Sequence, residues 1–184
     1  MDLDKCEIFG DSARRLSVTK LSNLIDFVYD KEKAKRILKS GEDPIIYEVV
    51  GFETPKVEGN LSAAITILNP GKIGDEYYMT RGHFHQKENT SEIYICLSGR
   101  GFLLTQNKKG EVNVQEMARG RVLYVPPAWA HRVINVGSTK LIFLAIYPSD
   151  AGHDYGAIKG RGFKKIVIER NGRPSIEDNP RWRD

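Results

Sequence analysis

Short apolar or alternating runs, separated by turn sequences, fill the chain from Pro44 to Tyr147. The turns include Asn69-Pro70-Gly71, Ser98-Gly99-Arg100-Gly101 and Asn135-Val136-Gly137, whose residue types favour chain reversal. Sustained helical periodicity is absent here, so the pattern favours β-strands. The predicted strands are residues 45–52, 61–68, 77–85, 92–97, 101–106, 112–116, 121–125, 131–135 and 141–147, with 166–168 as a further candidate. Many short strands with regular turns predict an all-β antiparallel sandwich or barrel.

Several of these strands are apolar on both faces. The run Leu141-Ile142-Phe143-Leu144-Ala145-Ile146 is the clearest case, because side chains of a strand alternate between its two sides. Such a strand needs cover on each side. We expect a second sheet on one face and either the N-terminal arm or a partner subunit on the other.

The first 43 residues differ from the rest. Asp30 can cap a short helix over residues 31–38, with Ile37 and Leu38 facing inward and Gly41 ending it. We therefore divide residues 1–184, a single domain, into an N-terminal helical or extended arm (1–43), a β-barrel core (44–170) and a polar surface tail (171–184).

Composition places the chain among globular proteins. The 184 residues are 40% apolar and include 17 glycines besides, which suffices for the core of one domain. The net charge is only +4, and the run Lys31-Glu32-Lys33-Ala34-Lys35-Arg36 has the mixed signs of a solvated face. Nucleic-acid surfaces carry denser basic stripes, and no helix-turn-helix segment is evident, so no nucleic-acid partner is expected.

Cysteines and chain start indicate the compartment. Cys6 and Cys96 lie far apart without a metal or redox spacing, and Cys96, inside an apolar strand, is expected to pack as a small hydrophobe. The start Met1-Asp2-Leu3-Asp4-Lys5 lacks the apolar stretch of a signal peptide. The longest apolar run is too short to cross a bilayer. We expect a cytoplasmic protein with no membrane partner.

Histidines and one acid suggest a metal site. All four histidines fall between positions 83 and 153. His83 and His85 point the same way if they lie on one strand, while Glu92 and His131 lie on two further predicted strands. Three imidazoles and a carboxylate suit a divalent iron, manganese, nickel or zinc ion with positions left for a substrate.

The same residues carry a family resemblance. His83-x-His85-x6-Glu92-x6-Gly99 resembles the first signature of the cupin superfamily, and Gly120-x5-Pro126-x-Ala128-x2-His131-x3-Asn135 resembles the second. Ala128 replaces a usual glycine, the gap before Glu92 is longer than usual, and the glycine that usually opens the first signature is missing. The order of the ligand types is preserved. The resemblance implies a double-stranded β-helix, or jelly roll, with one divalent metal in its mouth.

A narrower resemblance is to the archaeal-type, cupin phosphoglucose isomerases. It is carried by Thr80-Arg81-Gly82-His83-Phe84-His85, Glu92-Ile93-Tyr94, Pro126-Pro127-x-Trp129-x-His131 and Tyr147…His153-x-Tyr155-Gly156. It implies that the metal ligands are His83, His85, Glu92 and His131. It also implies that the substrate phosphate is held by Tyr47, Thr66, Thr80, Gly82 and Tyr155, and that Tyr94, Tyr147 and His153 surround the reacting end of the sugar.

Some of these implied roles agree with strand geometry, and one does not. Thr66 is a hydroxyl within an apolar strand, and Tyr94 shares the parity of Glu92. Thr80 and Gly82, however, have opposite parity to His83 and His85 on a regular strand. A bend or bulge near Gly82 is needed to bring both sets to one cavity.

The resulting interpretation is a metal-dependent aldose–ketose isomerase that interconverts glucose 6-phosphate and fructose 6-phosphate in glycolysis or gluconeogenesis. The resemblance favours Fe²⁺, with Ni²⁺, Mn²⁺ or Zn²⁺ as alternatives, and a homodimer. Glu92, Tyr147 and His153 are the catalytic candidates, for either enediol proton transfer or a hydride shift. Two other functions stay open: an iron-dependent cupin dioxygenase, and a non-catalytic sugar-binding cupin.

Overall fold

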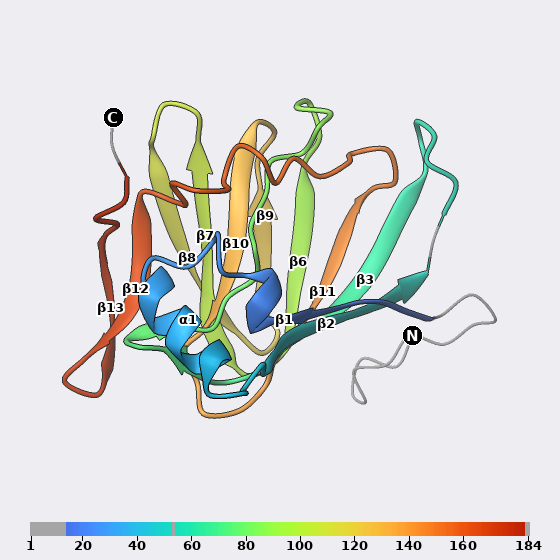
Figure 1. The fold of residues 1–184 in the computed structure, drawn as a ribbon. Coiled ribbons are helices and arrows are strands. Elements are labelled where there is room, and N and C mark those ends of the chain that lie inside the picture. Colours follow the sequence, from blue (N-terminus) through green and yellow to red (C-terminus); the bar gives the residue numbers. More distant parts are fainter. Residues whose placement is uncertain (1–13, 53, 183–184) are drawn as a thin grey trace.

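The computed structural model describes residues 14–52 and 54–182 of the chain, so the positions of Cys6 and of the first five residues lie outside the described part. Strands dominate, with one short α-helix (Figure 1). The elements are β1 (Arg14–Lys20), a 3-10 turn (Leu21–Asn23), α1 (Lys31–Lys39), β2 (Ile45–Phe52), β3 (Leu61–Leu68), β4 (Lys72–Ile73), β5 (Glu76–Tyr77), β6 (Glu92–Ser98), β7 (Arg100–Asn107), β8 (Val112–Ala118), β9 (Val122–Val125), β10 (Trp129–Asn135), β11 (Leu141–Pro148), β12 (Lys165–Arg170) and β13 (Arg173–Asp178).

The strands form three antiparallel sheets. Their orders are β1-β2-β3-β11-β6-β9, β10-β7-β8 and β13-β12-β5-β4. One buried cluster contains Tyr94 and Phe143 from the first sheet together with Leu103 and Val133 from the second. These two sheets therefore share a core, in the all-β arrangement of the cupin double-stranded β-helix, as predicted. No helix in the described ranges is long and apolar enough to span a membrane.

The N-terminal helix forms where its capping residues predict it. Asp30 Oδ1 accepts a hydrogen bond from the Lys33 N–H at 2.8 Å, which satisfies one of the free donors at the start of a helix. Gly41 follows with φ of +90°, a conformation that glycine adopts readily. Ile37 and Leu38 are partly buried against the core, as expected.

Strand β1 was not predicted. It pairs with β2, so that Val18 lies opposite Glu48, and it adds an outer strand to the largest sheet. Its sequence alternates, but Leu16 and Val18 are its only aliphatic residues, which is a weak period-2 signal. This strand also reaches the cavity described below.

The predicted strand 77–85 is wrong as a continuous element. Only Glu76–Tyr77 forms a strand, and the next residues make isolated bridges, Met79 to Ile134 and His83 to His131. From Met79 to His83 this segment advances four residues, whereas β10 advances only three between their partners. One extra residue on one side of a pair of strands is a β-bulge. Gly82, at φ +74°, lies within it. The bulge needed to reconcile Thr80 and Gly82 with His83 is present.

The polar C-terminal segment is mostly exposed, although Asn179 within it is buried, and part of it forms a strand. Residues Arg173–Asp178 form β13, which pairs with β12 from Lys165↔Asp178 to Arg170↔Arg173. Asn171 and Gly172 between them both have positive φ, 51° and 73°. An Asn-Gly pair is a strong hairpin signal, so this strand could have been found by its turn.

Candidate functional site

A cavity of about 240 Å³ opens between the two main sheets. Strands β1, β2, β3, β6, β10 and β11 and the segments 80–83 and 153–155 contribute to its wall. Tyr47 comes from β2, Thr66 from β3 and Tyr147 from β11. Because these strands are neighbours with inward residues in register, side chains far apart in the sequence meet at one place.

Every residue that the resemblance assigns to the substrate lines this cavity. The set is Tyr47, Thr66, Thr80, Gly82, Tyr94, Tyr147, His153 and Tyr155. Two of the four metal-ligand candidates, His83 and His131, line it as well. His85 and Glu92 lie behind them, 6% and 4% exposed. The structure thus brings the whole predicted set together, while the role of each residue is a separate question.

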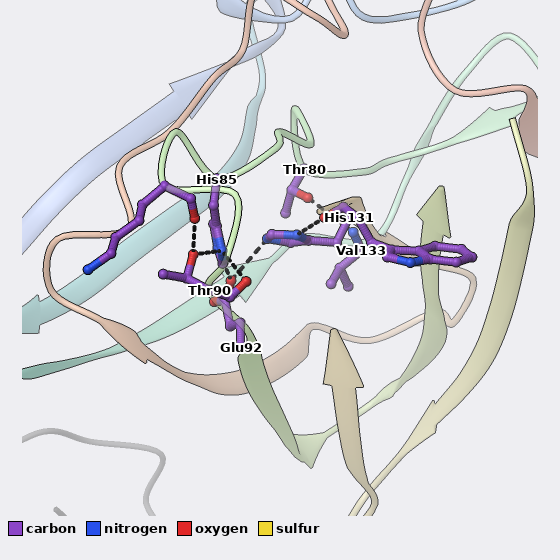
Figure 2. A network of polar contacts seen from close by, with 8 residues as sticks. Thr80, His85, Thr90, Glu92, His131 and Val133 are labelled. Carbon is purple, nitrogen blue, oxygen red and sulfur yellow. Dashed lines mark hydrogen bonds and ion pairs between the residues drawn. The ribbon is translucent and has the colours of Figure 1, made fainter. Parts of the chain in front are cut away.

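The four ligand candidates form one cluster. One ligand atom from each of His83, His85, Glu92 and His131 lies within 4.8 Å of all the others. Glu92 Oε2 is 3.2 Å from His85 Nε2 and 3.0 Å from His131 Nε2 (Figure 2). Ligand atoms bound to one cation at about 2.1 Å lie at most roughly 4.2 Å apart. The cluster is therefore close to the size of a closed coordination shell.

The hydrogen bonds of His85 fix which nitrogen faces the cluster. Thr90 Oγ1 donates to the Lys87 carbonyl at 2.6 Å and lies 2.8 Å from His85 Nδ1 (Figure 2). Since the hydroxyl hydrogen is used, His85 Nδ1–H donates to Thr90, and in this tautomer Nε2 carries a lone pair. That lone pair faces the Glu92 carboxylate, an arrangement of two acceptors that a cation stabilises.

Two further nitrogens support the fit to a metal. Among the described residues, His83 Nε2 and His131 Nε2 are buried without a hydrogen-bond partner, and His131 Nε2 lies near Glu92 without hydrogen-bond geometry. A buried polar atom without a partner carries a free-energy cost. Three imidazole nitrogens and a carboxylate are ligands that iron, manganese, nickel and zinc accept. The residues present fit a divalent metal.

The electrostatics leave the ligand atoms free to bind a cation. Burial, together with His131, His153 and His85, lowers the pKa of His83 well below its usual value, so its ring is neutral. Burial alone would raise the pKa of Glu92, but His131 and His85 outweigh it and hold that pKa at about 2. Glu92 is therefore ionised at neutral pH. It is the one carboxylate among the four.

Aromatic side chains surround the cluster on the cavity side. His153 stacks on Tyr155 with 5.7 Å between ring centroids, and its ring lies 4.3 Å from that of His83. The Tyr94 ring lies 5.8 Å from that of His131. Burial, with Glu92 as a second cause, holds the pKa of Tyr94 well above its usual value. Its hydroxyl therefore stays protonated and can donate a hydrogen bond.

Sequence reasoning missed part of the site. Ser17, Val18 and Thr19 of β1 line the cavity, and only the weak alternation of that strand could have shown it. Arg81 was not missed, since its sequence position left a contact with an anionic ligand and a salt bridge equally open. It lines the cavity, with its guanidinium carbon 5.6 Å above the Tyr155 ring and its Nε buried without a partner in the described structure. Arg132, behind the site, carried no sequence signal at all.

Comparison with known proteins identifies the family of the chain. The family model for glucose-6-phosphate isomerase matches residues 18–183. The glucose-6-phosphate isomerase of Thermococcus kodakarensis is 50% identical over 184 residues, covering 100% of this chain and 95% of that protein. That of Thermococcus litoralis is 48% identical over 167 residues, 91% of this chain and 87% of that protein.

More distant similarities have also been found. A putative glucose-6-phosphate isomerase of Rhizobium meliloti is 37% identical and covers 89% of this chain and 78% of that protein. The solved structure of oxalate decarboxylase from Bacillus subtilis is 28% identical with a TM-score of 0.47, over 58% of this chain and 26% of that one. The family model spans nearly all described residues, and near-full-length relatives share half the sequence. The chain therefore belongs to the cupin-type, archaeal family of glucose-6-phosphate isomerases.

Proposed function

We propose that this chain is a metal-dependent isomerase that interconverts glucose 6-phosphate and fructose 6-phosphate, in glycolysis or gluconeogenesis. The observation that carries the proposal is the joining of two features in one cavity. A His₃Glu cluster lies at its back, and the hydroxyl-rich wall of the same cavity contains every residue implied to hold the sugar phosphate. Family membership supplies the substrate class.

The phosphate end of the substrate is proposed to meet hydroxyl and N–H donors. Thr80 Oγ1 already accepts from the Val133 N–H at 3.1 Å, so its own hydrogen is free to donate to a phosphate oxygen. Tyr47, Thr66 and Tyr155 add hydroxyls from other elements of the same wall. Gly82 adds a backbone N–H with no side chain in front of it.

At the reacting end, hydrogen must move between the two adjacent carbons that bear the carbonyl and the hydroxyl. A divalent cation, when bound, would polarise both oxygens and acidify the intervening C–H bond. Glu92 is the proposed base for the carbon-bound proton, and His153 and Tyr147 are placed to move protons at the two oxygens. Tyr94, held protonated, can orient the sugar by donating a hydrogen bond.

Fe²⁺ is the proposed native metal, with Ni²⁺, Mn²⁺ and Zn²⁺ as alternatives that the same ligands accept. Imidazoles bind a metal in their neutral form, so three of them with one carboxylate would leave a divalent metal site with a net positive charge. That charge suits a substrate carrying a phosphate and two ligand oxygens. We place the enzyme in the cytoplasm, where phosphorylated hexoses are made and used.

The function is tested by metal removal and reconstitution. Purified protein is expected to convert fructose 6-phosphate to glucose 6-phosphate, to lose this activity with a chelator, and to regain it with Fe²⁺, Ni²⁺ or Mn²⁺. A coupled assay with glucose-6-phosphate dehydrogenase measures the product, and oxygen consumption is followed in parallel. Turnover that persists without oxygen excludes the dioxygenase alternative. No turnover in the reconstituted protein would reject the isomerase.

A homodimer is also proposed, through the outer face of the six-stranded sheet. Ile65, Leu97 and Leu144 form a second apolar cluster there, separate from the main core. Ile93 and Val122 on adjacent strands of that sheet are 41% and 67% exposed. A broad apolar face on a sheet favours association, and a self-complementary face suits a two-fold dimer.

Ile93→Lys is expected to convert the dimer to a monomer, because it places a charge within the apolar interface. Ile45→Lys is the matched control. Ile45 has a similar exposure of 39%, but its side chain lies on the cavity side of β2, with those of Tyr47 and Val49, and not on the outer face of the sheet. Sedimentation velocity measures the mass of both. Equal masses for the two variants would place the interface elsewhere.

A further inference from the structure

Arg132 follows the metal-ligand candidate His131 but points to the other side of its strand. Side chains alternate along β10, so His131 faces the cavity while Arg132 faces the four-stranded sheet β13-β12-β5-β4. There it lines a narrow gap together with Glu76 and Val167. The residue is only 3% exposed. Arginine stays charged in proteins, and a buried charge needs close partners to be tolerated.

Those partners are backbone carbonyls of two loops, and the buried carboxyl of Glu76 is a further neighbour that favours the charged guanidinium. Arg132 Nη2 and Nε donate to the Arg81 carbonyl at 2.7 Å and 3.3 Å, and Nη2 also donates to the Phe27 carbonyl at 3.3 Å. The guanidinium lies 4.9 Å above the Phe163 ring. The strongest of these contacts therefore goes to the bulge that precedes His83.

The bulge explains why the Arg81 carbonyl needs such a partner. On either side of it the backbone pairs with β10, through Thr80 N–H to the Val133 carbonyl and His83 N–H to the His131 carbonyl. The peptide unit between Arg81 and Gly82 is left out of this ladder. Its carbonyl accepts a hydrogen bond from Arg132, which lies on the side away from the cavity.

The other end of that peptide unit is its N–H. In a trans peptide the C=O and N–H point in opposite directions, and the described chain has no cis peptide bonds. A carbonyl held toward Arg132 therefore directs the Gly82 N–H the opposite way, toward the cavity that Gly82 lines. Within the described residues this N–H has no hydrogen-bond partner.

Close packing keeps this peptide in place. A Cβ on Gly82 would lie 2.5 Å from the Phe163 ring and 3.1 Å from Arg132 Cβ, so the Gly82 backbone packs directly against both side chains. The guanidinium also polarises the peptide it grips, because a charge-assisted bond at the carbonyl makes the N–H a stronger donor.

We propose that Arg132 is a positioning residue for the substrate phosphate: it fixes the Arg81–Gly82 peptide so that the Gly82 N–H faces the phosphate, and it places a buried positive charge behind that peptide. This proposal rests on the proposed sugar-phosphate substrate. Arg132 itself touches neither the substrate nor the metal, and it acts through the backbone of the bulge.

The test compares Arg132→Met and Arg132→Lys with the wild type, all loaded with metal. Inorganic phosphate is the probe, measured by isothermal titration calorimetry, beside kcat and KM for fructose 6-phosphate and metal content per subunit. Arg132→Met is expected to weaken phosphate binding and raise KM roughly tenfold, with kcat changed less than about threefold and metal content unchanged. Arg132→Lys, which restores the charge and one donor, is expected to fall between.

Arg181→Met is the matched control. Arg181 also donates to a carbonyl of the same N-terminal loop, that of Val28, but it does not line the cavity. It is expected to lower the melting temperature and leave phosphate affinity and KM unchanged. A melting temperature that falls in Arg132→Met with wild-type phosphate affinity and KM would make Arg132 merely structural and overturn the proposal.

The remaining outcomes separate this proposal from the proposed function. If Arg132→Met does not fold, Arg132→Lys decides: phosphate binding at least about threefold weaker supports the role, and wild-type binding overturns it. Phosphate binding that depends on Arg132 in a protein without isomerase turnover would support the role and reject the function. A wild-type protein that isomerises but does not bind phosphate would overturn the role alone.

Discussion

Glu92→Gln is expected to lower kcat for fructose 6-phosphate by roughly 10²- to 10⁴-fold, the range that a positioned acid or base contributes. Glutamine preserves the size of the side chain and removes its charge. Glu92 is 4% exposed and is the one carboxylate in the His₃Glu cluster, so water does not replace it easily. The assay is run at saturating metal, with metal content determined on the same sample, because loss of a ligand and loss of a base both reduce turnover.

The same variant separates the two routes for hydrogen transfer. In an enediol route the base exchanges its proton with solvent, so turnover in D₂O places deuterium on the carbon of the product. In a hydride shift it does not, and Glu92 serves only as a ligand. A metal-loaded Glu92→Gln protein with more than a tenth of the wild-type kcat would contradict the proposed base.

Glu88→Gln is the control for this substitution. Glu88 precedes the same strand, is exposed, and pairs with Lys108 at the surface. The exchange of one carboxylate for an amide is identical, but the residue lies outside both the cluster and the cavity wall. We expect wild-type kcat and metal content.

Strand patterns predicted most of the barrel because they depend on local sequence. Strands β2 and β3 occupy the predicted ranges 45–52 and 61–68 to the residue, since each is a continuous apolar or alternating run between turn residues. The stretch 77–85 reads the same way, yet it breaks into β5 and a bulge. The bulge is set by pairing with β10 and by the packing of Phe163 on Gly82, which are tertiary contacts without a local pattern.

The candidate site also contains residues that local sequence could identify and residues that it could not. His83 and His85 are two residues apart and Glu92 begins the next strand, so their residue types and order in the sequence were enough to suggest a shared metal site, although the expected strand 77–85 is not continuous. His131 was recognised as a third imidazole on another predicted strand, whereas the phosphate-side residues needed the family resemblance, because nothing local joins Thr66 to Tyr155. Arg132 could not be found either way. Its importance depends on which peptide the bulge leaves unpaired, and only the three-dimensional structure shows that.

His131→Ala is expected to weaken metal binding on the order of a hundredfold or more, since even residues that only orient a ligand contribute 10- to 100-fold. His131 brings the third imidazole from a different strand, and its Nε2 is buried without a hydrogen-bond partner in the described structure. Alanine removes that nitrogen and leaves an open shell of His83, His85 and Glu92. Metal per subunit after dialysis against buffered Fe²⁺ measures the effect, with circular dichroism as the check on folding.

His153→Ala is the matched histidine for this experiment. His153 lines the same cavity and its ring lies 4.3 Å from that of His83, but it is not in the ligand cluster. It is expected to retain its metal while kcat falls, whereas His131→Ala loses both together. The two variants would then differ in metal content, because only His131 is proposed to bind the cation. Metal content unchanged in His131→Ala would show that the shell is drawn from other residues.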